Sequence, residues 1–472
     1  MSAVIHWFRR DLRLTDNPAL AAAIASGYPV VCAYVHAPDE EGAWRPGAAS
    51  DWWLHHSLVA LDADLRRRGS SLVVRKGPSA ATLLALASEC GATQLTWNRL
   101  YEPALVARDA MVKQQLCAAG LDVESCKAAL LFEPWELQTG SGGPYRVFTP
   151  YWRKARSRLE PGRSLPAPAR MPALNAPGSL PIEGLRLLPR VRWDAGVTLA
   201  WTPGEAGAQE NLDQFLDAAL AGYASERDRP DHAGTSRLSP HLHFGEISPR
   251  QVVQAIAARG PLAHGEAYLR ELGWRDFSHH LLFHYPRMTD EPLNAQFARF
   301  PWAPSDPAVL AAWRNGRTGV PLVDAGMREL WATGWMHNRV RMVVASFLCK
   351  NLRLHWREGA RWFWDTLVDA DLANNTQGWQ WSAGSGADAA PYFRIFNPVS
   401  QGERFDPRGD YVRRWVPELA RVPAAAVHAP WTLRPVDQAA AGIACTPYAH
   451  PIVDLAQSRA AALAAYQQMR AG

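Results

Sequence analysis

The sequence predicts a two-domain protein in which an α/β domain with a doubly wound parallel sheet precedes a large all-α domain. Two observations predict this order: short apolar runs alternate with helical patterns over residues 1–130, whereas the spacing is helical, with few convincing strands, from about residue 201 onward. The chain has 472 residues, which is long for a single domain. We therefore expect an α/β domain at 1–131, a connecting segment at 132–200 and a helical domain at 201–472.

Five apolar runs in the first domain are predicted strands, at residues 3–8, 30–35, 71–75, 94–97 and 122–126. Asn17 before Pro18 indicates a capped helix start, and four leucines spaced by three or four residues indicate a helix face: Leu54, Leu58, Leu61 and Leu65. The sequence contains neither G-x-G-x-x-G after the first strand nor G-x-x-x-x-G-K-[ST]. Ordinary dinucleotide and nucleoside triphosphate sites are therefore not expected in this domain.

The connecting segment is rich in glycine and proline, at 140–144 and across 161–189, and its weak periodicity predicts a long surface linker. Residues 151–200 contain nine basic and three acidic residues, so the net charge of +5 lies in this segment. Bulk charge of this kind does not by itself indicate DNA binding.

In the helical half, residues 335–354 and 358–372 have helical spacing, and the domain is large enough to enclose a cofactor. The six cysteines are scattered without a C-x-x-C pair, so neither a metal site nor a disulfide framework is predicted. The apolar run at the start is too short for a secretory signal, and no run reaches the length of a membrane span. We expect a cytoplasmic protein without membrane contact.

Two polar clusters in the helical half are candidates for ligand binding. Residues 234–240 offer hydroxyl and backbone N–H groups just before a helix that begins near Ser239, which suits a diphosphate, although an ordinary serine cap would explain them too. Helical spacing also brings Glu271, Trp274 and Arg275 onto one face. That face either stacks on a base and contacts a phosphate, or is an exposed ion pair beside a core indole.

Two further clusters each allow a functional and a structural interpretation. Residues 334–342 are dense in polar groups, and Asp369, Asp371 and residues 374–375 could pair with Arg341 or with a polar heterocycle. An ion-pair network alone would account for them as well. Four tryptophans are either stacked core residues or a chain of indoles that relays an oxidising hole: Trp302, Trp356, Trp379 and Trp381.

With these motifs the chain resembles the DNA photolyase/cryptochrome family over essentially its whole length, and most closely the class I cyclobutane pyrimidine dimer photolyases. The resembling segments follow the family's order and spacing, at residues 7–14, 234–240, 334–342, 369–375, 378–381 and 393–398. The resemblance implies an antenna-type α/β domain, a helical FAD-binding catalytic domain and a light-dependent lyase that acts on DNA.

The resemblance implies FAD contacts along the helical domain. Arg341 and Asp369 would pair beside the isoalloxazine ring, and Asn375 would face its N5 atom. Tyr223 and the hydroxyl-rich segment would hold the phosphate and ribityl groups. The implied FAD contacts are Tyr223, Thr235, Ser236, Arg237, Leu238, Ser239, Tyr268, Asn338, Arg341, Asp369, Ala370, Asp371 and Asn375.

The same resemblance implies DNA contacts and an electron route. Trp274 and Trp381 would clamp a dimer flipped out of the helix, and Glu271 and Asn338 would bond its thymine edges. Five residues would hold the DNA strand: Arg227, Arg275, Arg339, Arg394 and Gln401. Three residues would carry the hole from the flavin to the surface, in the order Trp379, Trp356 and Trp302.

The implied reaction uses reduced, anionic FAD, which near-UV or blue light excites. The excited flavin donates an electron to a cyclobutane pyrimidine dimer in single- or double-stranded DNA, two C–C bonds break, and the electron returns. The protein positions the partners and needs neither a general base nor a metal. A monomer is expected.

Three alternatives to this activity remain. Cryptochrome photoreceptors commonly change the residue at Asn375 or lose the tryptophans at Trp274 and Trp381, and often extend beyond the helical domain. Photolyases of (6-4) photoproducts typically place an extra histidine where this chain has Asn338 and Met342, and their iron–sulfur branch needs four cysteines where the helical half has two. A non-enzymatic nucleic-acid-binding module would not require the flavin contacts.

A second, antenna chromophore, either a folate or a deazaflavin, would bind in or beside the α/β domain. Folate-type relatives often carry Asn-Glu shortly after a Tyr-Glu pair, whereas Tyr101 and Glu102 are followed here by Pro-Ala-Leu. Thr289 and Asp290 also depart from the Cys-Lys pair sometimes found there. These departures disfavour methenyltetrahydrofolate and leave the identity of the antenna open.

Overall fold

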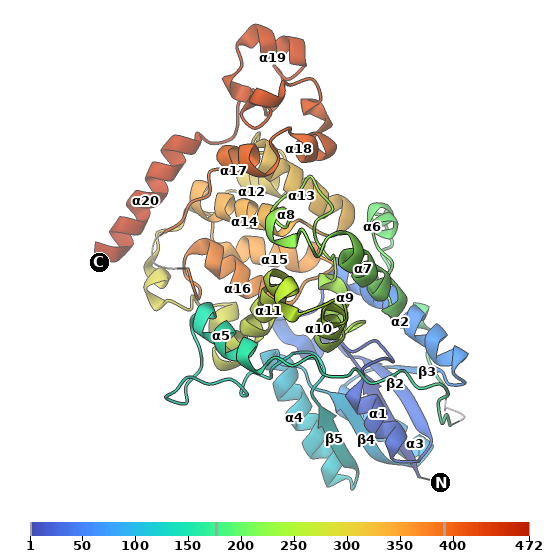
Figure 1. Cartoon of the computed structure of the whole chain (residues 1–472). Coiled ribbons are helices and arrows are strands. Elements are labelled where there is room, and N and C mark those ends of the chain that lie inside the picture. Colours follow the sequence, from blue (N-terminus) through green and yellow to red (C-terminus); the bar gives the residue numbers. More distant parts are fainter. Residues whose placement is uncertain (1, 175–177, 390–392, 472) are drawn as a thin grey trace.

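The computed structural model describes residues 2–174, 178–389 and 393–471. The N-terminal domain contains a five-stranded, entirely parallel sheet in the order β3-β2-β1-β4-β5 (Figure 1). The strands are β1 (Ala3–Phe8), β2 (Val30–His36), β3 (Leu72–Lys76), β4 (Ala92–Asn98) and β5 (Asp122–Cys126). The chain crosses to the other half of the sheet after β3, so the sheet is doubly wound. All five predicted strands are confirmed, with ends that differ by no more than two residues.

Helices cover both faces of this sheet, namely α1 (Pro18–Ala25), α2 (Ala48–Arg67), α3 (Ser79–Cys90) and α4 (Pro103–Ala118). Successive side chains of β1 point to opposite faces, so Val4 packs with α1 and α2 whereas Ile5 packs with α3 and α4. The predicted cap of α1 is confirmed, because the Asn17 side chain accepts a hydrogen bond from Leu20 N at 3.0 Å.

The second domain is helical and lies above the α/β domain in Figure 1. Its longest helix, α11, runs through a single large core. The helices from residue 205 onward are α7 (Glu205–Ala218), α8 (Tyr223–Glu226), α9 (Ser239–Phe244), α10 (Pro249–Ala258), α11 (Glu266–His284), α12 (Pro307–Arg314), α13 (Pro321–Thr333), α14 (Asn338–Ser346), α15 (Trp356–Thr366), α16 (Leu372–Ala383), α17 (Pro398–Phe405), α18 (Asp410–Trp415), α19 (Pro435–Ala441) and α20 (Leu455–Ala471).

Two predicted helices are longer than the observed ones. The helix predicted over 335–354 is α14 followed by a π-helical turn, η6 (Phe347–Asn351), because the side chain of His337 caps the start of α14. The helix predicted over 358–372 is α15 and stops before a turn, since Asp371 caps the next helix. Periodicity alone does not detect these breaks, because apolar residues continue to face the core on both sides of each cap.

The connecting segment is not a structureless linker throughout. It contains α5 (Phe148–Arg158), whose Phe148, Tyr151, Trp152 and Ala155 are buried in the core of the helical domain, and a short helix, α6 (Ala195–Ala200). These four positions have the spacing of one helix face, which is a signal that the high glycine and proline content obscured. Residues 175–177 of the proline-rich stretch lie outside the described part of the chain.

The two domains dock where α9 ends against the loop after β1. Leu12 N donates to Phe244 O at 3.1 Å, and Arg13 Nη1 donates to Gly245 O at 2.8 Å. Gly245 has a φ of +68°, and a Cβ atom there would lie 2.1 Å from Arg10 O. The C-terminal end of α9 is therefore in close backbone contact with the α/β domain, and this contact fixes the position of the whole helix.

Candidate active site

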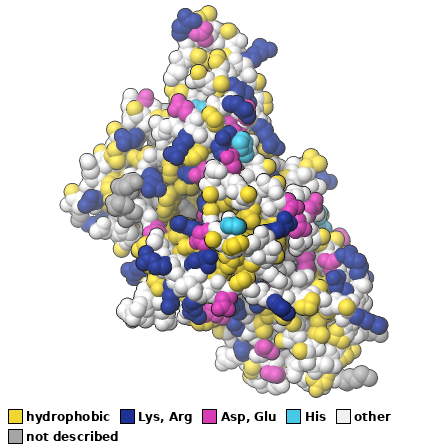
Figure 2. Space-filling model, viewed as in Figure 1, with side chains coloured by type: hydrophobic (Ala, Val, Ile, Leu, Met, Phe, Trp, Pro, Cys, Tyr) yellow, Lys and Arg dark blue, Asp and Glu magenta, His cyan; other side chains and the backbone are white. Residues whose placement is uncertain are grey.

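A cavity of about 510 Å³ opens in the helical domain between α8, the segment before α9, α11, α14, α15 and α16. This volume lies within the usual range for cofactor sites. Figure 2 shows basic side chains spread over this face of the molecule, around a hollow in which hydrophobic side chains are exposed. Every residue that the resemblance implies for FAD lines the cavity: Tyr223, Thr235, Ser236, Arg237, Leu238, Ser239, Tyr268, Asn338, Arg341, Asp369, Ala370, Asp371 and Asn375.

At one end of the cavity, the segment before α9 presents a cation and hydroxyl groups. Tyr268 OH donates to Ser236 Oγ at 2.8 Å, and the Arg237 guanidinium lies 4.1 Å from the ring centroid of Trp201. Arg237 Nη2 is buried without a hydrogen-bond acceptor among the described residues. A buried guanidinium N–H without an acceptor is costly, so this end of the cavity fits an anionic diphosphate.

The alternative of an ordinary serine cap does not hold at α9. Leu238 occupies the cap position, and no side chain caps the helix there. Ser239 Oγ instead accepts a hydrogen bond from the Trp335 indole at 3.3 Å.

At the opposite side, α14 meets the turn before α16. Arg341 Nη2 donates to Asp369 Oδ2 at 2.9 Å, so the predicted pair is present. Asp369 lines the cavity, and its Oδ1 atom is buried without a hydrogen-bond donor among the described residues. This oxygen is therefore suited to accept a hydrogen bond from an N–H group of a ring in the cavity. Asn375 Nδ2 donates to Ala360 O at 2.9 Å, which fixes the side chain on the cavity wall.

Asp371 both caps α16 and carries a buried charge. Its Oδ1 accepts from Asn374 N at 2.8 Å, while its Oδ2 lies 3.1 Å from His279 Nε2 and 3.5 Å from His243 Nδ1. Burial alone would raise the pKa of Asp371, but His279 and His243 hold it well below its usual range. This carboxylate therefore stays ionised on the cavity wall.

The face predicted for α11 is confirmed, because Glu271, Trp274 and Arg275 all line the cavity. Trp274 stacks on Phe148 at 3.7 Å between ring centroids, and Trp381 lines the cavity from α16. The Arg394 guanidinium lies 5.5 Å from the Trp381 ring. Two indoles are thus presented to one cavity, both partly exposed.

The arginines expected to hold DNA differ in their surroundings. Arg227 is paired with Glu271, and Arg339 Nη2 lies 2.6 Å from Asp228. Arg275 donates to Ala129 O at 2.6 Å and to Leu242 O at 3.2 Å, so its guanidinium joins two segments of the protein. The expected contact of Arg275 with a DNA phosphate stays a prediction. Three of the expected DNA contacts lie outside the cavity wall: Arg339, Arg394 and Gln401.

The proposed relay tryptophans extend away from the cavity. Trp379 lines the cavity and packs on Gly359, where a Cβ atom would lie 2.0 Å from the indole. Trp356 lies on α15 one turn before Gly359 and is buried. The centroid of the His355 ring lies 5.6 Å from that of Trp356 and 5.0 Å from that of Trp302. Trp302 is partly exposed, so the series ends near the surface.

Several residues of the cavity wall were not predicted from the sequence. Trp335 lies inside the motif at 334–342 and could have been found from it, since its indole is as large as the residues that were singled out. His243 and Phe363 have no local signal in the sequence. His243 lies on the six-residue helix α9, and Phe363 lies on the apolar face of α15.

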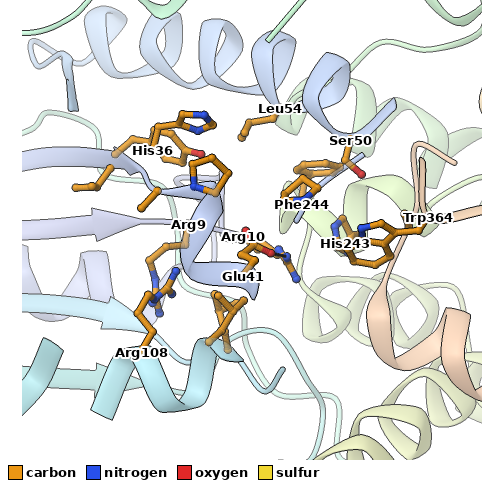
Figure 3. A pocket seen from close by; sticks show the side chains of 18 residues that line it. Arg9, Arg10, His36, Glu41, Ser50, Leu54, Arg108, His243, Phe244 and Trp364 are labelled. Carbon is orange, nitrogen blue, oxygen red and sulfur yellow. Dashed lines mark hydrogen bonds and ion pairs between the residues drawn. The ribbon is translucent and has the colours of Figure 1, made fainter. Parts of the chain in front are cut away.

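A second, smaller cavity of about 70 Å³ lies between the two domains (Figure 3). In Figure 3, Arg10 and Glu41 lie together on the side of the α/β domain, and His243, Phe244 and Trp364 face them from the helical domain. His243 and Ala370 line both cavities, so they form the wall between them.

Within residues 2–174, 178–389 and 393–471, no group of three or more His, Cys, Asp or Glu side chains could hold a metal ion. No helix in the same part of the chain is long and apolar enough to cross a membrane.

A parallel-sheet domain docked on a helical domain with this cavity defines a class of flavoprotein. The family model described as DNA photolyase matches residues 4–173, and that described as the FAD binding domain of DNA photolyase matches residues 268–468. A deoxyribodipyrimidine photo-lyase of Agrobacterium fabrum is 47% identical and covers 99% of this chain and 98% of its own. The chain belongs to the DNA photolyase family, and its cofactor is FAD.

Photoreceptors and repair enzymes both occur among the similar proteins. Cryptochrome-1 of Arabidopsis thaliana is 42% identical over 98% of this chain and 70% of its own length. The crystal structure of a class III photolyase from Agrobacterium tumefaciens has a TM-score of 0.95 at 46% identity and covers 100% of this chain and 98% of its own. An archaeal photolyase from Sulfolobus tokodaii, solved with two FAD molecules, has a TM-score of 0.84 at 28% identity, covering 99% and 100%. The expected class I subtype is not confirmed.

Proposed function

We propose that this chain repairs DNA in light, splitting cyclobutane pyrimidine dimers with an electron from photoexcited, reduced FAD. The observation that carries this proposal is that Trp274 and Trp381 line the same cavity as the residues that fit FAD. Relatives named deoxyribodipyrimidine photo-lyase, which match over nearly the whole chain, support it.

The cavity residues hold and orient the cofactor, which supplies the light-driven electron when bound. Arg237 and Ser236 bind the diphosphate, and Asp369 accepts a hydrogen bond from the flavin ring while Arg341 fixes the carboxylate. Asn375 is held by Ala360 O on the wall that faces the ring. These contacts exclude water from the ring and preserve its orientation toward the lesion.

Lesion binding falls to the other part of the cavity. A dimer flipped out of single- or double-stranded DNA stacks on Trp274 and Trp381, and Glu271 and Asn338 bond its edges. In the free protein Glu271 is paired with Arg227, so DNA binding requires this pair to be exchanged for a phosphate and a base edge. The protein acts in this way as a cytoplasmic monomer.

Photoreduction of the flavin uses Trp379, Trp356 and Trp302 as successive donors, ending at the partly exposed Trp302. The burial of the first two and the placement of Trp379 on the cavity wall support this order.

A photoreceptor without repair activity is the second candidate, favoured by the similarity to a plant cryptochrome. The purified holoprotein is incubated with oligonucleotides that contain either a cyclobutane dimer or a (6-4) photoproduct, in blue light and in darkness. We expect repair of the cyclobutane dimer in light only. Repair of the (6-4) lesion alone, or of neither lesion by reduced enzyme, would reject the proposed activity.

An antenna chromophore, folate or deazaflavin, completes the proposal, since a related archaeal structure holds a second chromophore. The cavity between the domains is too small in this structure for the whole of either molecule, so binding there requires some of the lining side chains to move. The absorption spectrum of the purified protein, followed by extraction and mass spectrometry, identifies the chromophore.

A further inference from the structure

Buried charges connect the flavin cavity with the α/β domain. Asp371 on the cavity wall lies 3.5 Å from His243, and His243 is part of the wall that the flavin cavity shares with the cavity between the domains. Arg10, on the loop after β1, lines that second cavity and lies opposite His243 (Figure 3). Charged side chains of the α/β domain thus lie on the far side of the wall that bounds the flavin cavity of the helical domain.

Arg10 is held in place by two carboxylates of its own domain. It is paired with Glu102 and lies 2.6 Å from Glu41, and only 13% of its side chain is exposed. Burial alone would lower the pKa of Arg10, but Glu102, Glu41 and Asp371 raise it, so the side chain stays charged. Burial would likewise raise the pKa of Glu102, and Arg10 holds it below its usual value.

Arg10 and two histidines surround the carboxylates of this cluster. Asp371 and Glu102 are ionised, and His279 Nε2 lies 3.1 Å from Asp371 Oδ2. Burial lowers the pKa of His243, whereas Arg10 stays charged. Removing the guanidinium would leave these carboxylates with less compensation in a poorly solvated region. Charges act over longer distances there than in water, so the change would extend to the flavin cavity.

We propose that Arg10 is a positioning residue of the α/β domain that adds to the positive charge around Asp371 and thereby raises the reduction potential of the FAD bound in the helical domain. Reduction adds negative charge to the flavin, so a nearby cation favours the reduced form and an uncompensated carboxylate disfavours it. The inference rests on the proposed placement of the isoalloxazine ring beside Asp371.

The test is the midpoint potential of the flavin in the intact holoprotein, measured in darkness by spectroelectrochemical titration. Arg10→Gln is expected to shift the potential to more negative values, and Glu102→Gln to more positive values. Arg10→Lys keeps the charge and should leave the potential close to that of the parent protein. If the substitutions only loosened the contact between the domains, Arg10→Gln and Glu102→Gln would shift the midpoint potential in the same direction. That result would overturn the proposal.

Arg108→Gln is the matched control. Arg108 lines the same cavity and is buried, but it is paired with Asp109. Its loss removes one positive charge from the same domain, and a shift as large as that of Arg10→Gln would overturn the proposal. If Arg10→Gln fails to retain FAD, Glu102→Gln decides the question: a shift to more positive values supports the proposal, and no shift overturns it.

Asp371→Asn separates this inference from the proposed flavin placement. It should shift the potential to more positive values, because it removes a carboxylate from the cavity wall. If Asp371→Asn shifts the potential while the variants at Arg10 and Glu102 do not, the inference fails and the placement stands. If none of these variants shifts the potential, the ring does not lie beside Asp371 and the placement itself is wrong.

Discussion

Trp274 and Trp381 are the side chains expected to contribute most to lesion binding. Stacking of a base on an indole is worth roughly 1–3 kcal/mol, so Trp274→Ala or Trp381→Ala should weaken binding of dimer-containing DNA about five- to a hundredfold. Binding is measured in darkness by titration of a labelled oligonucleotide, with FAD content checked by absorbance. Trp331→Ala is the control, because Trp331 is 59% exposed and does not line the cavity. Equal losses of affinity in all three variants would contradict the proposal that Trp274 and Trp381 bind the lesion.

Trp379 separates photoreduction from repair. Trp379→Phe should abolish light-driven reduction of oxidised FAD, because phenylalanine is much harder to oxidise than tryptophan, while most of the apolar volume against Gly359 is kept. The same variant, reduced chemically beforehand, should still split dimers. Flavin absorbance under blue light with an external reductant, followed by a repair assay, measures both properties.

Trp97→Phe is the matched control for Trp379→Phe. Trp97 is also buried, but it belongs to the core of the α/β domain. Normal photoreduction in Trp379→Phe would refute the relay. Loss of repair with fully reduced FAD bound would give Trp379 a different role.

At the scale of elements, the end of α9 tests how domain docking supports the cofactor site. Gly245→Ala should destabilise the protein and weaken FAD retention, because the new Cβ atom would meet Arg10 O at 2.1 Å and displace the helix that starts at Ser239. We expect a loss of roughly 2–4 kcal/mol from the clash and the positive φ together. Thermal unfolding and FAD release measure the two effects.

Gly442→Ala isolates the cost of backbone conformation in that experiment. Gly442 has a φ of +77° at the end of α19, with no atom within 4 Å of the added Cβ position. It should cost only about 1 kcal/mol and leave FAD retention unchanged. If the two variants behave alike, the contact between Gly245 and Arg10 does not support the cofactor site.

The cap of α14 predicts a dependence of stability on pH. Burial lowers the pKa of His337 to about 4, and its Nδ1 accepts from Arg339 N at 3.2 Å, which requires an unprotonated nitrogen. The unfolded chain protonates this residue near its ordinary pKa of about 6.5, so it binds more protons than the folded chain between these values. The stabilisation is therefore complete above about pH 6.5 and is lost as the pH falls toward 4.

Urea unfolding near pH 7.5 and near pH 5 tests this dependence. The free energy of unfolding should fall by about 2 kcal/mol more in the parent than in His337→Asn, whose amide caps the helix without titrating in this range. Identical pH profiles for the two proteins would mean that His337 does not carry the effect.

At the scale of the whole molecule, DNA affinity should fall with rising salt concentration. Each arginine that neutralises a phosphate lowers the slope of log K against log salt by about 0.9, so Arg394→Gln should reduce its magnitude by about one. Arg434→Gln is the control, because Arg434 lies at the start of α19 and is not among the expected DNA contacts. Undamaged duplex should bind more weakly than damaged duplex at every salt concentration. A slope that Arg394→Gln and Arg434→Gln change equally would contradict the proposed surface.

Arg275 should behave differently from Arg394 in the same experiment. Its guanidinium joins Ala129 O and Leu242 O, so Arg275→Gln should lower thermal stability and leave the salt slope unchanged. If Arg275→Gln reduced the slope of log K against log salt without loss of stability, Arg275 would be a DNA contact.

The sequence by itself determined the strands, the fold class and the implied FAD contacts, all of which line the flavin cavity. Central strands of a sheet covered on both faces are short, nearly continuous apolar runs, as in the fully buried β1 and β2, so local composition identified them. The cavity residues were found because they lie in motifs whose order and spacing match a known family. Helix ends were less predictable, because the side chains of His337 and Asp371 stop periodic patterns that continue beyond them.

Only the tertiary structure decided what surrounds each charged side chain. Nothing near Arg275 in the sequence indicates that its guanidinium is taken up by Ala129 O and Leu242 O. The same is true of Arg10, which lies near the start of the chain and meets the surroundings of Asp371 across the domain boundary. Sequence motifs report which residues are present, whereas burial, charge and hydrogen bonding depend on which distant segments the fold packs around them.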